Sequence, residues 1–367
     1  MENSRKMIPV TWSSMPTYEE YCEEIKDLFK TRWLSNRGDK HHLLHKQLET
    51  YLKAKNLALF ANGHLALEIA IDAFDLDGEV ITTPYTHVST THCIVRNGLM
   101  PVFCDISEKD CNINAEQIED HINEKTVAIV ATHVYGYVCD VHEIERIAKK
   151  HNLKVFYDAA HAFGVTVGDR GVATFGDAAM FSTHATKVFQ TIEGGVVAFN
   201  DDSVFSKINP LTNFGYTSQE TIDYIGTNAR MNEFEAAMGI CNLRYIDGQI
   251  AQRKKATERY LEHLQNVPGI KLLEEQKGVR HNYSYFPAIF DGYKVTRDEI
   301  QEKLKKENIF ARKYFYPLTN DTGCYRDKYG SARTPVATHV ADRVLSLPLY
   351  SDLTIEDVDR ICKIVLS

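Results

Sequence analysis

The amino-acid sequence predicts an α/β protein, with a large domain built on a mostly parallel sheet and a smaller α+β domain at the C-terminal end. From about residue 57 to 200, short β-branched runs alternate with amphipathic helical patterns, which is typical of a parallel sheet covered by helices. After Leu243 the pattern changes to a charged helical stretch, a strand-like run and another helix. We therefore expect a large domain over residues 1–245 and a small domain over 246–367.

The individual helices and strands can be assigned from the sequence. A helix is predicted in the middle of the large domain, because Val141, Ile144 and Ile147 recur at helical spacing and the stretch ends in basic residues, as the helix dipole favours. The small domain is predicted to contain a helix, a strand and a second helix, over 252–265, 283–290 and 295–308. Short apolar runs are predicted as the strands of the large domain, at 79–82, 101–104, 127–130, 155–157, 178–181 and 196–199.

The composition is that of an ordinary globular protein, with 367 residues, 44% hydrophobic and 25% charged. The formal net charge of -8 gives no broad attraction for nucleic acid or an anionic membrane, so neither is expected as a partner. Eight cysteines occur singly, which predicts reduced thiols in a cytoplasmic protein, with a disulfide framework as the alternative. The polar start (residues 1–16) and the absence of a long apolar run predict neither signal peptide nor membrane span. No metal-ligand spacing is present, so no metal site is expected.

Two charged residues follow predicted strands, where open α/β sheets bind their ligands. Asp158 directly follows the run KVFY, and His161 comes three residues later. This Asp is either a functional carboxylate or a helix cap or metal ligand. Lys187 lies between two predicted strands, flanked by hydroxyls, His184 and a glycine pair. It is either a surface charge or a partly buried amine whose lowered pKa makes it a nucleophile.

Two further segments contain residues that could bind a cofactor. Asn62 and Gly63 open a predicted helix, where backbone N–H groups and the dipole favour a phosphate, although a plain helix cap fits equally. Tyr85 and His87 follow the strand at 79–82, where a flat side chain either stacks on a planar cofactor or packs in the core. A lysine, a carboxylate, a helix N-terminus and a planar side chain are together what pyridoxal phosphate (PLP) chemistry requires.

An ordered series of motifs along nearly the whole chain resembles the DegT/DnrJ/EryC1/StrS family of sugar aminotransferases. The resemblance implies the fold of fold-type I PLP enzymes, with PLP as cofactor and pyridoxamine phosphate as the form that carries the amino group. The motifs are WLSNRG (33–38), NGHLALEIA (62–70), TPYTHVSTTH (83–92), PVFCDI (101–106), THVYG (132–136), YDAAHAFG (157–164), TFGDAAMFSTHATKVFQTIEGG (174–195), GTNARMNEFEAAMG (226–239) and LSLPLYSDLT (345–354).

Position within these motifs implies roles around the cofactor ring. Lys187 would bind PLP covalently and shuttle protons, and Asp158 would pair with the pyridine nitrogen. His161, where the family has Gln or His, would lie beside the phenolic oxygen. The ring-stacking position, commonly Phe, Tyr or Trp, is His87 here, which offers less area for stacking.

The resemblance also implies a phosphate site shared between subunits. Gly63, His64 and Ser182 would bind the phosphate, together with Asn228 from the other subunit, which is followed by Arg230. A homodimer with shared active sites would then be the functional unit. The phosphate loop usually has Thr at position 64, so the backbone at Gly63 is expected to matter more than the His64 side chain.

Lys187 also distinguishes aminotransferases from dehydratases within the family, because the dehydratase relatives carry His at this position. The resemblance implies transfer of an amino group from L-glutamate to a nucleotide-linked 4-keto-6-deoxysugar, with dTDP-4-keto-6-deoxyglucose as the expected acceptor, in O-antigen and lipopolysaccharide synthesis. A 3-aminotransferase acting on a dTDP-3-keto-6-deoxyhexose, a cyclitol ketone aminotransferase and a non-catalytic regulator are the alternatives. Expected substrate contacts are His184, Arg230, Lys313 and Tyr316.

Overall fold

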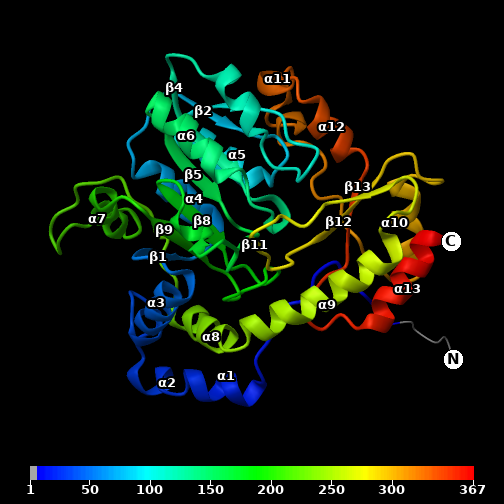
Figure 1. The fold of residues 1–367 in the computed structure, drawn as a ribbon. Helices are drawn as coiled ribbons and strands as arrows, with labels where there is room; N and C mark the ends of the chain where they lie inside the picture. Colours follow the sequence, from blue (N-terminus) through cyan, green and yellow to red (C-terminus); the bar gives the residue numbers. More distant parts are fainter. Residues whose placement is uncertain (1–5) are drawn as a thin grey trace.

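The computed structural model describes residues 6–367, so the first five residues of the polar start lie outside it. Figure 1 shows a larger unit around a twisted sheet and a smaller unit that contains the C-terminus, joined by the long helix α9 (Ile246–Leu264). All eight cysteines are free thiols. No helix within residues 6–367 is long and apolar enough to cross a membrane.

The large unit is built on a seven-stranded sheet in the spatial order β1-β9-β8-β5-β4-β2-β3. Strands β8, β5, β4, β2 and β3 pair in parallel, and β9 pairs antiparallel with both β1 and β8. The carboxyl ends of every strand except β9 therefore meet at one edge. The strands are β1 (Asn56–Phe60), β2 (Glu79–Thr82), β3 (Met100–Phe103), β4 (Thr126–Thr132), β5 (Lys154–Asp158), β8 (Ala178–Ser182) and β9 (Gly195–Phe199).

The six predicted strands and the mostly parallel sheet are confirmed, with ends that differ by up to two residues. Strand β1 was not predicted, because its run of Leu and Ala lacks the β-branched residues that favour strands. The antiparallel direction of β9 was also missed, since an apolar run carries no information on strand direction. Both strands matter for the site. Phe60 at the end of β1 pairs with Gly195 at the start of β9, next to the loops at this edge of the sheet.

Helices cover both faces of this sheet. One apolar cluster packs α3 (Asp39–Leu52), α6 (Val141–His151) and α8 (Glu233–Leu243) against one face. A second cluster packs α4 (Gly63–Asp72), α5 (Val88–Arg96) and α7 (Asp202–Leu211) against the other. The predicted helix around Ile144 is α6, whose Val141, Ile144 and Ile147 are buried. Strands covered on both faces require nearly continuous apolar runs, which explains why the strands stand out in the sequence.

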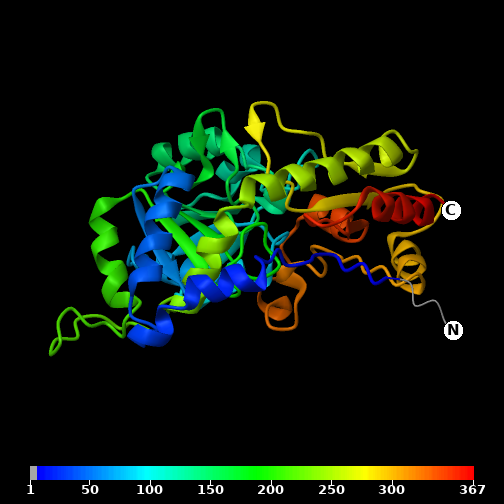
Figure 2. The same ribbon diagram turned by 90° about the horizontal axis from the view of Figure 1, so that it is seen from below.

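The small unit has a three-stranded antiparallel sheet in the order β10-β12-β13. The predicted helices correspond to α9 and α10, and the predicted strand is the shorter β12. The extended segment before α1 runs back along this unit, as Figure 2 shows, and Ile8 packs in its core and bridges to Ile309. The elements are β10 (Ile270–Leu272), β12 (Phe286–Phe290), β13 (Val344–Leu347), α10 (Arg297–Lys306), α11 (Arg326–Tyr329), α12 (Pro335–Ala341) and α13 (Ile355–Leu366).

The remaining elements are short. Two N-terminal helices lie beside α8, and a small sheet of two-residue strands connects the two units. They are α1 (Tyr18–Ile25), α2 (Leu28–Thr31), β6 (Thr166–Val167), β7 (Arg170–Gly171) and β11 (Val279–Arg280), with single turns of 3-10 helix at Val134–Gly136, Val172–Thr174 and Thr319–Asp321 and a longer one at Ala115–His121.

Candidate active site

A cavity of about 630 Å³ opens at the sheet edge where the strand carboxyl ends meet. Residues from the loops after β1, β2, β5 and β8 line it, as expected for an open α/β sheet. Eight of the residues predicted from the sequence lie in its wall: Gly63, His64, His87, Asp158, His161, Ser182, His184 and Lys187.

Asp158 is the last residue of β5 and is buried, with 3% of its surface exposed. Its Oδ2 accepts a hydrogen bond from the Thr90 hydroxyl at 2.6 Å, and its Oδ1 accepts one from the Ala160 backbone N–H at 3.0 Å. The Thr90 hydroxyl lies 2.9 Å from that of Thr86. A buried carboxylate held by two donors keeps its orientation toward the cavity, where it can hold a cationic group.

Lys187 lies in the segment between β8 and β9. Two backbone hydrogen bonds shape this segment, one from Lys187 N–H to the His184 carbonyl and one from Ala185 N–H to the Ile192 carbonyl, at 2.9 and 2.7 Å. Burial lowers the pKa of the Lys187 ammonium, while the charges of Asp158 and Tyr314 oppose that shift. A lowered pKa increases the fraction of neutral amine near pH 7, which is the nucleophilic form.

Helix α4 begins at the cavity with Gly63. Asn62 caps the helix, because its Oδ1 accepts the Leu65 N–H at 2.9 Å. A Cβ on Gly63 would lie 3.0 Å from the Ser182 Cβ and 3.2 Å from its Oγ, so glycine favours this close approach of the helix to β8. The first N–H groups of a helix have no partner within it, so those at Gly63 and His64 are available to an anion.

His161 is buried among aromatic rings. Its Nδ1 accepts the Tyr135 N–H at 3.1 Å, and its ring stacks on Phe315 with 5.9 Å between centroids and 5° between planes. The Tyr285 ring packs edge-on at 4.7 Å. Burial lowers the pKa of His161 well below its usual value, helped by nearby Lys187 and His87. The neutral ring therefore carries its proton on Nε2.

Sequence reasoning missed three aromatic residues of the cavity wall. Tyr285, Tyr314 and Phe315 come from the small unit and line the same cavity as Lys187. Tyr285 lies in the predicted strand run at 283–290, but nothing in that run indicates contact with the large unit. Contacts between the two units depend on tertiary packing. Only a recognised motif next to these residues in the sequence, with a known position in the fold, could have indicated them.

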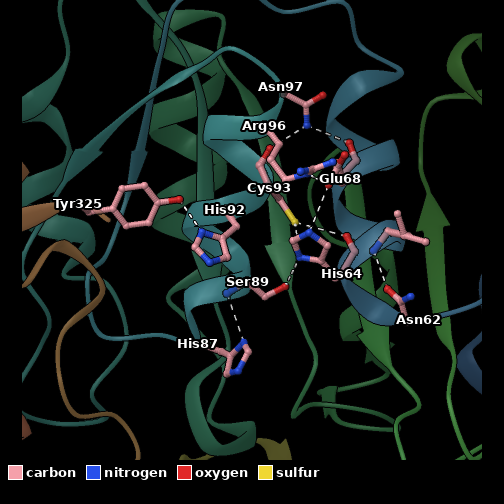
Figure 3. Close-up of polar contacts among 11 residues, drawn as sticks. Asn62, His64, Glu68, His87, Ser89, His92, Cys93, Arg96, Asn97 and Tyr325 are labelled. Atoms are coloured by element: carbon pink, nitrogen blue, oxygen red, sulfur yellow. Dashed lines mark hydrogen bonds and ion pairs between the residues drawn. The ribbon is translucent and has the colours of Figure 1, made fainter. Parts of the chain in front are cut away.

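His87 and His64 lie at the N-terminal ends of two helices that border the cavity, α5 and α4 respectively. His87 caps α5, and its Nδ1 accepts the Ser89 N–H at 3.2 Å. Burial lowers the pKa of His87. The His64 ring lies between Ser89 and Glu68, with Nδ1 at 2.7 Å from the Ser89 hydroxyl and Nε2 at 3.3 Å from the Glu68 carboxylate (Figure 3). The His64 side chain is therefore part of a polar network rather than free in the cavity.

The family model described as DegT/DnrJ/EryC1/StrS aminotransferase matches residues 17–366. The chain belongs to this family. A dTDP-4-amino-4,6-dideoxy-D-glucose transaminase of Escherichia coli is 40% identical over 365 residues, covering 98% of both chains. A protein of the same name from Shigella dysenteriae is 39% identical, covering 97% of both chains. A solved structure of DesI in the presence of its TDP-sugar product has a TM-score of 0.93 at 30% identity, covering 98% of this chain and 92% of that one.

Four predicted site residues of this aminotransferase lie outside the cavity lining. Asn228 is exposed, and its Oδ1 accepts hydrogen bonds from the Arg230 guanidinium, which itself borders a separate surface hollow near Arg37. Lys313 pairs with Asp298 at 2.6 Å and lies over the Tyr316 ring, at 5.7 Å from its centroid. These side chains therefore do not belong to the cavity wall that contains Lys187.

Proposed function

We propose that this aminotransferase uses PLP and that its catalytic residues are Lys187 and Asp158. The observation that carries the proposal is that one cavity holds a lysine of lowered pKa, a buried carboxylate and a helix start held open by Gly63. These are the groups that the aldehyde, the pyridine nitrogen and the phosphate of PLP each need. The residues present therefore fit this cofactor.

PLP, when bound, supplies a ring that accepts electrons from the carbon bearing the amino group. The neutral amine of Lys187 Nζ would be the base that moves the α-proton of the amino donor. The Asp158 carboxylate, whose orientation Thr90 and Ala160 fix, would hold the ring nitrogen protonated. His161 Nε2–H would donate to the phenolic oxygen, and His87 would cover the ring.

L-glutamate is proposed as the donor and dTDP-4-keto-6-deoxyglucose as the acceptor, giving dTDP-4-amino-4,6-dideoxyglucose for O-antigen synthesis in the cytoplasm. The two relatives of that activity, similar over nearly their full length, support this choice. The proposed domains, 1–245 and 246–367, would both contact the sugar, since Tyr314 and Tyr285 line the cavity from the second. Of the other expected contacts, His184 lies in the wall.

A homodimer is proposed because Asn228 and Arg230 lie outside the cavity of their own subunit. They would complete the phosphate and substrate sites of the partner. The exposed segment that carries them includes apolar side chains, with Ile225 at 98% and Ile222 at 58% exposure. Apolar side chains this exposed are typical of a protein interface.

An acceptor panel tests the substrate assignment. The enzyme loaded with amino groups by L-glutamate is offered dTDP-4-keto-6-deoxyglucose, a dTDP-3-keto-6-deoxyhexose, GDP-4-keto-6-deoxymannose and a cyclitol ketone. We expect amination of the first at the highest kcat/KM, measured by mass spectrometry of the product. Preference for any other acceptor would contradict the assignment while leaving the aminotransferase intact.

A further inference from the structure

The side of the cavity where α4 and α5 begin carries a linked pair of polar side chains, one from each helix. His64 is in the first turn of α4 and Ser89 in the first turn of α5, and both line the cavity. The His64 Nδ1 and the Ser89 Oγ are 2.7 Å apart, which joins the two helix starts directly (Figure 3). Neither residue's side chain has a role in the proton transfers proposed above.

The network behind this pair holds a negative charge. Glu68 Oε2 lies 3.3 Å from His64 Nε2 and accepts a 2.7 Å hydrogen bond from Arg96 Nε. When Nε2–H of His64 donates to Glu68, its Nδ1 accepts from the Ser89 hydroxyl in the neutral ring. In that state the Ser89 proton is directed at His64 and not into the cavity.

Protonation of His64 reverses the bond to Ser89. With both ring nitrogens carrying protons, Nδ1–H donates to Ser89 Oγ, and the serine hydroxyl proton is free to turn into the cavity. The imidazolium then lies between the Glu68 carboxylate and the cavity, at the N-terminal ends of two helices. A dianionic phosphate there would favour the added charge and accept the freed donor.

We propose that His64 takes up a proton from solvent when the cofactor phosphate binds, and that Ser89 thereby becomes a phosphate donor. Ser89 then supplies the hydroxyl that position 64 lacks. The inference rests on the proposed function, since it concerns the phosphate of the proposed cofactor. His64 and Ser89 are positioning and binding residues here, and the covalent chemistry remains with Lys187.

The other ionisable groups around His64 fit this role. On α5, Cys93 Sγ lies 3.5 Å from its Nδ1, and the His92 ring lies 6.5 Å away with its Nδ1 bound to the Tyr325 hydroxyl. Burial raises the pKa of the Cys93 thiol and lowers that of His92, so both are neutral near pH 7. His87 is also neutral there, because burial lowers its pKa. Glu68 and Arg96 lie beside the ring, and the other acidic and basic side chains of the cavity wall include Asp158, Glu193 and Lys187, whose pKa burial lowers.

The test uses the full-length protein freed of cofactor and two probes that cannot react with Lys187: pyridoxine 5'-phosphate and pyridoxine. The native protein is expected to bind the phosphorylated probe much more tightly. Ser89→Ala should weaken that probe's binding about tenfold and leave the binding of pyridoxine unchanged. The matched control is Ser206→Ala, which removes an exposed hydroxyl of α7 and should change neither dissociation constant.

Proton uptake is measured by calorimetry of the same titration in buffers of different ionisation enthalpy. The native protein should take up more protons per bound probe than His64→Asn, whose amide can hydrogen-bond Ser89 but cannot be protonated. Equal proton uptake by the native protein and His64→Asn would overturn the coupling between phosphate binding and protonation of His64. An unchanged preference of Ser89→Ala for the phosphorylated probe would overturn the role of the serine hydroxyl. If the native protein itself shows no preference for the phosphorylated probe, the proposed cofactor site fails and not this inference alone.

Discussion

At the scale of single residues, the cavity brings together an acidic and a basic side chain, Asp158 and Lys187, in different surroundings. Thr90 and Ala160 donate hydrogen bonds to the buried Asp158 side chain, whereas burial lowers the pKa of Lys187 and favours its neutral amine. The sequence predicted both residues from their places after strands. It did not predict Thr90, because a threonine inside a helix carries no signal of the carboxylate it contacts.

Substitution at Asp158 tests the need for its charge. Asp158→Asn keeps the shape of the side chain but loses the negative charge opposite the ring nitrogen, so kcat is expected to fall about a hundredfold or more. Thr90→Val keeps the charge and removes one hydrogen bond, which should cost about tenfold. Steady-state kinetics of the amino transfer measure both, and equal losses would show that orientation, not charge, is the requirement.

At the scale of elements, the start of α4 determines how close the backbone comes to an anion. Its capping residue, Asn62, and its first residue, Gly63, were predicted from the sequence as an anion-binding helix start. The close contact of Gly63 with Ser182 was not predictable, because it depends on the register of β9 against both β8 and β1.

Gly63→Ala tests that contact. The added Cβ would lie 3.0 Å from the Ser182 Cβ, so α4 has to move away from β8 and the affinity for PLP is expected to fall about tenfold or more. Gly248→Ala in α9 is the matched control, because its Cβ meets nothing within 4 Å and alanine favours a helix. Equilibrium binding of PLP compares the two variants, and an unaffected Gly63→Ala would exclude tight helix approach as the cause of phosphate binding.

Helix α3 contains a buried histidine, His41, that we expect to make the fold sensitive to acid. Burial lowers the pKa of His41 to about 3, and neither ring nitrogen has a hydrogen-bond partner. As the pH falls below about 6.5, the unfolded chain gains a proton that the folded chain refuses until about pH 3. Between these values, His41 lowers the free energy of unfolding by about 1.4 kcal/mol per pH unit.

His41→Leu should therefore reduce the loss of stability between pH 7 and pH 5, measured as the urea midpoint at each pH. The exposed His142 of α6 provides the control, and His142→Leu should leave the native pH dependence in place. If the urea midpoint of His41→Leu fell between pH 7 and pH 5 as much as that of the native protein, the buried imidazole would not be the cause of the acid sensitivity.

At the scale of the whole molecule, the site depends on parts of the chain that are far apart in sequence. Figure 1 shows the segment after α7 extending away from the sheet, and this segment leads to Asn228. The motif order predicted the fold and about half of the large-unit residues of the cavity. The contacts of Tyr285, Tyr314 and Phe315 could not be predicted, because they require the small unit to be placed against the sheet.

Subunit mixing tests whether Asn228 acts across a dimer. Lys187→Ala and Asn228→Ala are each expected to have little activity, but a hybrid dimer would contain one site with both native residues. Random exchange should therefore restore about a quarter of the native sites. Light scattering gives the oligomeric state, and the kinetics of the mixture give the recovery. No recovery from mixed dimers would mean that Lys187 and Asn228 of one and the same chain form a site, which would contradict the proposed sharing.

The most direct measurement is the absorbance of the purified protein with PLP, before and after adding L-glutamate, in parallel with Lys187→Ala. The native protein should show a visible band from the lysine-bound cofactor that glutamate removes and dTDP-4-keto-6-deoxyglucose restores. The variant should show neither the band nor its loss. A native protein that forms no such band, or whose band glutamate leaves unchanged, would contradict the assignment of Lys187 and of PLP-dependent amino transfer to this cavity.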